Sequence, residues 1–407
     1  MGPSHELKVL GALGYTSFEP RNVETILSTR FEGEGIFTQD GAAWKHSREL
    51  LRRPFQKTHY QDLKGFSQPL EDLTADIATP GGVVDLQPLF FRFTLATTTA
   101  LIFGQPVTTD INVRKSFASN FDYASLISAL RTRLVDFYWV YNPSEYKAAC
   151  KHVKAYADSF IERALGESNR KSEAIEDRYG FVEDLYENLE DKVLVRNQLV
   201  NVLLAGRDTT ACLLSWTLFL LVRHRSVLKS LQAEIQTVMK NKQELTRQLI
   251  QKMPYLRCIL NETLRLYPPI PINVRFARRA TILPCGGGPD GQSPFLVRRG
   301  QGVGIPSYYL HRRKDLYGED AEQFRPERWE GTELADIGYG YLPFHGGHRL
   351  CLGKDFALTE ASCAIVRILQ EFPNIRIPPE ALVLPTGDEK QELTVFLRPA
   401  EGCKVLV

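Results

Sequence analysis

The chain has 407 residues, of which 43% are hydrophobic and 24% are charged, as in ordinary globular proteins with a large core. Its net charge of +2 gives no reason to expect a nucleic acid or a strongly acidic partner. The seven cysteines are scattered and include no Cys-x-x-Cys pair, which disfavours a disulfide framework or a zinc ribbon.

No run of about 18 apolar residues occurs, and the first forty residues lack the layout of a signal peptide. The apolar run at 213–222 is too short to span a bilayer and is predicted to be part of a buried core helix. We therefore expect a soluble chain.

Hydrophobic spacing predicts the elements of the first half. Residues 151–163 have the pattern of a helix, and 166–180 are charged and irregular, which favours an exposed connection. Residues 194–225 form a long helical pattern that is apolar on most sides in its second half. This pattern predicts a central helix that its neighbours bury.

The second half mixes helices with short strands. Residues 255–267 are predicted as a helix that two following prolines end. Residues 270–307 are rich in proline, glycine and short apolar runs, which indicates strands and turns. A helix is expected at 355–372 and short strands after 377. The fold class is therefore mainly α with a small β portion, in one continuous domain at 1–407.

The run 344–353 reads Phe-His-Gly-Gly-His-Arg-Leu-Cys-Leu-Gly. It sets one cysteine, Cys351, in a glycine-rich loop, with Arg349 two residues before it and an apolar helix after it. Such a thiolate suits haem iron, because glycines let the backbone approach a porphyrin and the arginine can meet a propionate. Two alternatives are a buried apolar cysteine beside a turn and a metal site of His345, His348 and Cys351.

The second candidate is Ala-Gly-Arg-Asp-Thr-Thr at 205–210, in the middle of the predicted central helix. A glycine there costs about 1 kcal/mol relative to alanine. Thr209 can bend a helix by bonding the carbonyl four residues back, which would open a notch. The alternative is a solvent-facing polar turn, but the apolar flanking residues disfavour it.

A third group combines Glu262 and Arg265, three residues apart on one helix face, with Arg328 farther along. A surface pair of this kind would be weak. If Arg328 completes a buried cluster, the group is a determinant of folding and of the cysteine loop.

A fourth group is Trp44 and Arg48, four residues apart on a helix face. An indole N–H and a guanidinium in this arrangement can hold the same carboxylate. The alternative is a Trp–Arg stack on a surface helix. Arg275, in a strand-like segment, gains a role only if propionates lie near it.

The pattern Phe-x-x-Gly-x-Arg-x-Cys-x-Gly resembles the haem-thiolate loop of the cytochrome P450 monooxygenases, and the other three groups follow in the family's order. The resemblance implies haem b with Cys351 as the axial ligand and a P450-type helical fold. The cofactor-binding residues it implies are Trp44, Arg48, Gly206, Arg275, Phe344, Gly347, Arg349, Cys351 and Gly353.

The same resemblance implies that Asp208 and Thr209 are the catalytic acid–alcohol pair, with Asp208 as the proton relay. One oxygen atom of O₂ would enter an aliphatic C–H bond and the other would leave as water. Electrons would come from NADPH through a flavoprotein reductase. A basic docking face is expected, although scattered solubilising charge is the alternative, at Arg48, Arg52, Arg53, Arg349 and Lys354.

Three short stretches, 205–211, 283–291 and 317–321, are similar to the fungal microsomal branch that hydroxylates n-alkanes and fatty acids. This likeness implies the endoplasmic reticulum membrane and a hydrophobic chain as substrate. Alternatives are a tailoring oxidase of a lipid-like secondary metabolite, a truncated haem-binding protein without activity, and an interaction protein that uses the loop for another metal.

The chain departs from that branch in two ways. It lacks the N-terminal anchor and proline-rich hinge, and 30–35 reaches Trp44 sooner than expected, so we expect an open pocket roof. His345 and His348 stand where relatives tend to have Asn and Pro, and losing a proline makes the loop easier to disorder.

Overall fold

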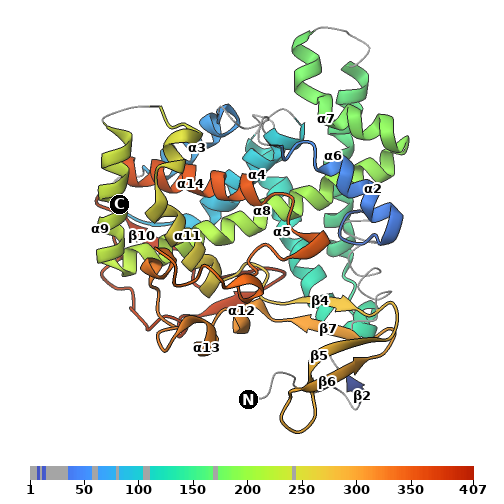
Figure 1. The fold of residues 1–407 in the computed structure, drawn as a ribbon. Helices are drawn as coiled ribbons and strands as arrows, with labels where there is room; N and C mark the ends of the chain where they lie inside the picture. Colours follow the sequence, from blue (N-terminus) through green and yellow to red (C-terminus); the bar gives the residue numbers. More distant parts are fainter. Residues whose placement is uncertain are drawn as a thin grey trace.

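The computed structural model describes residues 7–9, 12–14, 35–56, 63–78, 82–103, 111–167, 173–240 and 244–407. Helices dominate these ranges (Figure 1). The longer ones are α2 (Gly41–Leu51), α3 (Lys64–Ile77), α4 (Leu86–Phe103), α5 (Ile111–Arg133), α6 (Ser144–Glu167), α7 (Glu173–Leu189), α8 (Lys192–Arg223), α9 (Arg225–Met239), α11 (Pro254–Leu266) and α14 (Lys354–Glu371). Shorter ones are α10 (Arg247–Gln251), α12 (Ser307–Leu310) and α13 (Lys314–Tyr317).

The described strands form antiparallel pairs and no larger sheet. They are β1 (Leu7–Val9) with β2 (Ala12–Gly14), β3 (Val83–Asp85) with β10 (Lys404–Leu406), β4 (Asn273–Phe276) with β7 (Gly302–Ile305), β5 (Thr281–Gly287) with β6 (Ser293–Val297), and β8 (Gln391–Leu393) with β9 (Leu397–Pro399). The pairs β4–β7 and β5–β6 lie to one side of the helices (Figure 1). This confirms the predicted class, mainly α with a small β portion.

The centre of the structure is α8, which neighbouring helices surround (Figure 1). Asp191 caps its start by accepting hydrogen bonds from the N–H groups of Val193 and Leu194. Its first half belongs to one hydrophobic cluster and most of its second half to another. The predicted buried central helix is therefore confirmed.

The helices expected at 151–163, 255–267 and 355–372 lie within or nearly coincide with α6, α11 and α14. The expectation of an irregular connection at 166–180 was wrong for its second part, because α7 begins at Glu173. The charged sequence hid an apolar face: Val182 and Leu185 are buried three residues apart, and α7 packs on α6 and α8. Residues 168–172 lie outside the described residues.

Among the described residues, α4 alone is long and apolar enough to cross a membrane by itself, and α8 with α9 passes as a pair bent by 109°. In α4, 56% of the apolar window is buried inside the protein, and Phe90 and Phe103 belong to the core. Length and apolar composition alone do not separate a core helix from a membrane span.

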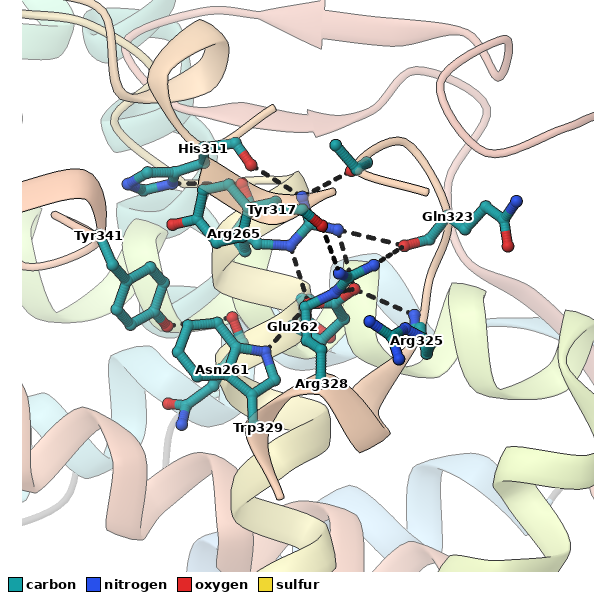
Figure 2. A network of polar contacts seen from close by, with 12 residues as sticks. Asn261, Glu262, Arg265, His311, Tyr317, Gln323, Arg325, Arg328, Trp329 and Tyr341 are labelled. Atoms are coloured by element: carbon teal, nitrogen blue, oxygen red, sulfur yellow. Dashed lines mark hydrogen bonds and ion pairs between the residues drawn. The ribbon is translucent and has the colours of Figure 1, made fainter. Parts of the chain in front are cut away.

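A buried carboxylate joins three parts of the chain (Figure 2). Glu262 of α11 bonds the Nε atoms of Arg265 at 2.8 Å and of Arg328 at 2.9 Å, and all three side chains are fully buried. The indole N–H of Trp329 (2.9 Å) and the backbone N–H of Arg325 (3.0 Å) also donate to it. The predicted Glu–Arg–Arg cluster is therefore confirmed.

The two arginines use their other N–H groups to hold the backbone between α12 and the short helix η3 (Pro326–Trp329). Arg265 donates to the carbonyls of His311 (2.7 Å) and Ala321 (2.6 Å), and Arg328 donates to that of Tyr317 (3.0 Å). The cluster thus fixes a segment that has little regular structure of its own.

A second polar seam lies where α4, α8 and α14 meet. Glu360 of α14 is fully buried and accepts hydrogen bonds from the hydroxyls of Thr97 and Thr210. Beside it, the Thr94 hydroxyl donates to the carbonyl of Arg207 in α8 at 2.7 Å. Burial raises the pKa of Glu360 from 4.5 to about 8, so the seam holds a protonated carboxyl group at neutral pH.

Replacing Glu262 tests the buried cluster. We expect Glu262→Gln to lower the free energy of unfolding by roughly 3–5 kcal/mol, because two buried guanidinium groups lose their counter-charge. Denaturant unfolding measures it. The control is Glu401→Gln, which breaks the exposed pair with Lys390 and should change stability far less, because solvent screens exposed charges. Equal costs for the two variants would contradict the assigned role.

Glu360 gives a pH dependence with a defined sign. Because its folded-state pKa is raised, the folded state binds more protons than the unfolded state between about pH 4.5 and 8. Stability should therefore fall as pH rises through this window, by up to roughly 1.4 kcal/mol per pH unit. Unfolding free energies measured against pH should show this slope in the wild type and lose it in Glu360→Gln, a neutral isostere. The same slope in both proteins would contradict the prediction.

Candidate functional site

The cysteine loop is a closed backbone turn that presents one thiol. The N–H of Cys351 donates to the carbonyl of Phe344 at 3.0 Å, which brings the two ends of the loop together. His345 (φ 65°) and Gly347 (φ 66°) take left-handed conformations, which glycine adopts freely and Asn or His more readily than most residues. The side chain of Cys351 is exposed, three residues before α14 begins at Lys354.

The surroundings of this thiol act on its charge in opposite directions. The protein around it raises the pKa of Cys351, whereas the backbone N–H groups of Gly353 and Lys354 and the guanidinium of Arg48 lower it. The donors at the start of α14 therefore face the sulfur. The net effect is a raised pKa, so the sulfur keeps its proton until a metal replaces it, and the same donors would then stabilise the thiolate.

Three arginines gather beside the loop, and the part of the chain that the structure describes provides little negative charge to balance them. Arg48 donates to the carbonyl of Leu350 at 2.8 Å, and burial and the neighbouring Arg349 lower its pKa. The pKa values of Arg275 and Arg349 are also lowered by burial, and Arg349 lowers that of Arg275 further. One carboxylate, the exposed Asp40, pairs with Arg349 at 2.5 Å.

Trp44 belongs to the same group. Its ring lies under the guanidinium of Arg349 at 4.5 Å and near that of Arg48 at 5.7 Å. The alternative of a Trp–Arg stack is therefore realised, and it also brings both arginines to the cysteine loop. Arg275 reaches the loop through His345, with 3.4 Å between nitrogens.

Helix α8 opens at one place in its middle. From 197 to 218 every residue is buried except Ala205, Gly206 and Thr209, which share one face of the helix. The Thr209 hydroxyl donates to the carbonyl of Ala205 at 2.6 Å. The predicted bond to the carbonyl four residues back is confirmed, and it occurs where the helix is open.

Asp208 is buried beside this opening and is not part of it. It is 6% exposed and bonds Arg207 at 2.8 Å, and Arg207 in turn bonds Asp122 of α5 at 2.7 Å. Burial raises the pKa of Asp208 to about 6, and Arg207 opposes the rise. Because Asp122 is 57% exposed, the chain of groups leads from the helix interior to the surface.

Close packing against α4 explains why residue 206 is a glycine, which the sequence did not reveal. A Cβ atom there would lie 2.6 Å from the hydroxyl oxygen of Thr98 in α4. The missing side chain therefore lets α4 and α8 approach closely. Its predicted contact with the cofactor stays a prediction.

The donor set fits a haem. It offers one accessible sulfur, backbone donors aimed at that sulfur, and three poorly balanced guanidinium groups for a group with two carboxylates. The alternative metal site of His345, His348 and Cys351 has no such support, because no cluster of three or more His, Cys, Asp or Glu in the described ranges could hold a metal.

The expected docking face is only partly free. Arg53 pairs with Asp184 of α7, and Arg349 with Asp40. Arg52 and Lys354 are exposed. The stretch 30–34, on which the expectation of an open pocket roof rests, lies outside the described residues.

Sequence reasoning missed two polar groups beside the site. Glu360 lies behind α8, and His311 bonds the backbone at the start of the cysteine loop. The sequence signal for Glu360 was a carboxylate in an otherwise apolar stretch of helix. His311 follows a four-residue helix and had no such signal.

Comparisons with known proteins agree with this geometry. The family model for cytochrome P450 matches residues 1–407. A cytochrome P450 of Arthroderma benhamiae is 45% identical over 99% of this chain and 83% of its own, and cytochrome P450 52A1 of Candida tropicalis is 38% identical over 98% and 79%. The crystal structure of the cytochrome P450DA haem domain superposes with a TM-score of 0.76 at 23% identity, covering 98% of this chain and 83% of that one. The chain therefore belongs to the cytochrome P450 family of haem-dependent monooxygenases.

Proposed function

We propose that this monooxygenase hydroxylates an aliphatic C–H bond of a hydrophobic chain such as an n-alkane or a fatty acid. The observation that carries the proposal is the open face of α8, which offers Ala205, Gly206 and Thr209 and no charge. The charged residues of the same segment, Arg207 and Asp208, are buried and bond each other. An uncharged opening in an apolar helix suits an apolar substrate.

The reaction converts R–H, O₂, two electrons and two protons into R–OH and water. When bound, the haem supplies the oxygen chemistry. We assign Cys351 as the axial ligand of the haem. We assign Arg48, Arg275 and Arg349, together with Trp44, as the partners of its propionates. The remaining residues of the family's loop pattern are assigned to the contact between the loop and the haem. These are Phe344, Gly347 and Gly353.

Protons are assigned to the Asp208–Thr209 pair. A carboxyl group with a pKa of about 6 gains and loses protons near neutral pH. Arg207 and Asp122 connect it to solvent, and the Thr209 hydroxyl lies on the open face. We propose that Asp208 takes up protons that enter from solvent beside the Asp122–Arg207 pair, whose guanidinium keeps its own protons, and passes them to the hydroxyl of Thr209.

The family uses a redox partner, and we propose an NADPH-dependent flavoprotein reductase that docks near Arg48, Arg52 and Lys354. By its likeness to the fungal microsomal branch, we place the protein at the endoplasmic reticulum membrane. We also propose that residues 1–407 form one haem domain, since α8 contributes to both hydrophobic clusters.

The substrate proposal is tested by spectral titration of the haem protein with n-alkanes and fatty acids of graded chain length, followed by product analysis with a reductase. Saturable binding and alcohol products support the proposal. Binding and turnover only with polycyclic or aromatic lipids would favour a tailoring oxidase. Haem incorporation without any turnover would favour a haem-binding protein without activity.

Thr209→Ala tests the proton assignment. We expect product per NADPH to fall by roughly 10- to 100-fold, with hydrogen peroxide formed instead, since positioned proton transfer typically contributes 10²–10⁴-fold and water replaces part of it. The matched control is Thr217→Ala, which removes the same kind of bond (2.7 Å, to the Leu213 carbonyl) at a buried position of α8. Unchanged coupling in Thr209→Ala would sink the assignment.

Cys351→Ser tests the ligand. Serine offers no thiolate, so we expect the iron–sulfur stretching band in the resonance Raman spectrum to vanish. Cys285→Ser is the control, because Cys285 is the other exposed cysteine of the seven. A Cys351→Ser protein that keeps the band would show that the ligand lies elsewhere.

A further inference from the structure

His311 lies beside the Glu262 cluster (Figure 2) and bonds Leu342, which leads into the cysteine loop. It directly follows α12 and is fully buried. Its Nδ1 is 3.2 Å from the carbonyl oxygen of Arg265, and its Nε2 is 2.8 Å from the backbone nitrogen of Leu342. The imidazole therefore touches the cluster on one side and the chain leading to Cys351 on the other.

The two contacts fix the state of the ring. A backbone N–H is always a donor, so Nε2 must accept from Leu342 and cannot carry a proton. A carbonyl only accepts, so Nδ1 must carry the hydrogen. Burial and the nearby charges of Arg265 and Arg312 lower the pKa of His311 to about 4, in agreement with a neutral ring.

Leu342 is where the loop begins to be held. Its carbonyl accepts from the N–H of His345 at 3.2 Å, and two residues later the carbonyl of Phe344 accepts from Cys351. Two neighbouring side-chain contacts also fix this segment: the Tyr341 hydroxyl donates to the carbonyl of Asn261 (3.0 Å), and the Tyr317 hydroxyl to that of Gly340 (2.9 Å).

We propose that His311, as the neutral Nδ1–H tautomer, is a positioning residue for the axial thiolate. Its hydrogen bonds to Arg265 and Leu342 connect the Glu262 cluster to the loop and so restrict the motion of the loop. The inference rests on Cys351 being the haem ligand. It predicts that the Nε2 acceptor matters for the loop, whereas a role in packing alone would depend only on the volume of the side chain.

Two variants separate these possibilities in the haem-loaded protein. His311→Asn can keep a donor near the Nδ1 position but loses the acceptor for Leu342. His311→Gln can place an amide oxygen near the Nε2 position. We expect amide hydrogen exchange in the loop (342–351) to speed up by roughly tenfold or more in His311→Asn, because an unmet buried N–H weakens the closed state. His311→Gln should restore much of the protection.

The haem spectrum gives a second readout. We expect His311→Asn to move a large part of the reduced carbon-monoxide complex from the thiolate type to the neutral-ligand type, and His311→Gln to return it. Thr217→Ala is the control: it removes a buried hydrogen bond inside α8 (2.7 Å, to the Leu213 carbonyl) without touching Leu342 or its neighbours. It should change stability while leaving exchange at Leu342 and the spectrum nearly unchanged.

A measurement on the wild type protects the test against variants that do not fold. Nitrogen-15 spectra of labelled histidine should show Nδ1 protonated and Nε2 unprotonated at His311. The opposite tautomer would overturn the proposal, as would wild-type loop exchange and spectrum in a folded His311→Asn protein. Wild-type protein without a thiolate-type spectrum would instead overturn the ligand assignment of Cys351, and the inference with it.

Discussion

The ion pairs of the buried Glu262 carboxylate with Arg265 and Arg328 are the interactions on which the structure around the cysteine loop depends. The carboxylate stands in the core with two guanidinium groups, and its oxygens accept from both of them, from an indole and from a backbone N–H. Burying three charges is tolerated only because their hydrogen-bonding groups find partners. The arginines donate further hydrogen bonds to backbone carbonyls, so the cluster fixes a segment that has little regular secondary structure.

Two groups of arginines near the cysteine loop differ in how their positive charge is balanced. Arg265 and Arg328 are matched by a carboxylate, and they serve the fold. For Arg48, Arg275 and Arg349, Asp40 is the one carboxylate found as a partner among the described residues, it pairs with Arg349, and burial and mutual repulsion lower the pKa values of the three arginines. The protein alone therefore leaves positive charge unbalanced where a dianionic cofactor would balance it. Functional sites commonly carry such a local cost in stability.

Helix α8 combines apolar burial with one polar interruption. The helix is open at Ala205, Gly206 and Thr209, and beside this opening Thr98 of α4 packs against Gly206 while Thr94 of α4 bonds the carbonyl of Arg207. The buried acids Asp208 and Glu360 have raised pKa values on the closed sides of the helix. The same short sequence thus contains the opening, the close helix contact and a buried acid with a raised pKa.

The sequence predicted the central helix, the helices at 255–267 and 355–372, the strand-rich region after Ile270 and the Glu262 cluster, because hydrophobic periodicity and motif spacing are local signals. It misjudged 173–180, where charged residues outnumber apolar ones, and the buried side chains that show the apolar face of α7, Val182 and Leu185, come only after this stretch. It gave no sign that Gly206 faces Thr98, that Arg207 joins Asp208 to Asp122, or that His311 meets Leu342. Those contacts join segments far apart in the chain, and only the packed structure brings them together.

The most direct test of the account is the carbon-monoxide difference spectrum of the purified, dithionite-reduced protein. The account predicts the red-shifted Soret band of thiolate-ligated haem, because Cys351 is accessible and the arginines beside it can bind the two propionates of the haem. A band of the neutral-ligand type, or no haem band at all, would contradict it.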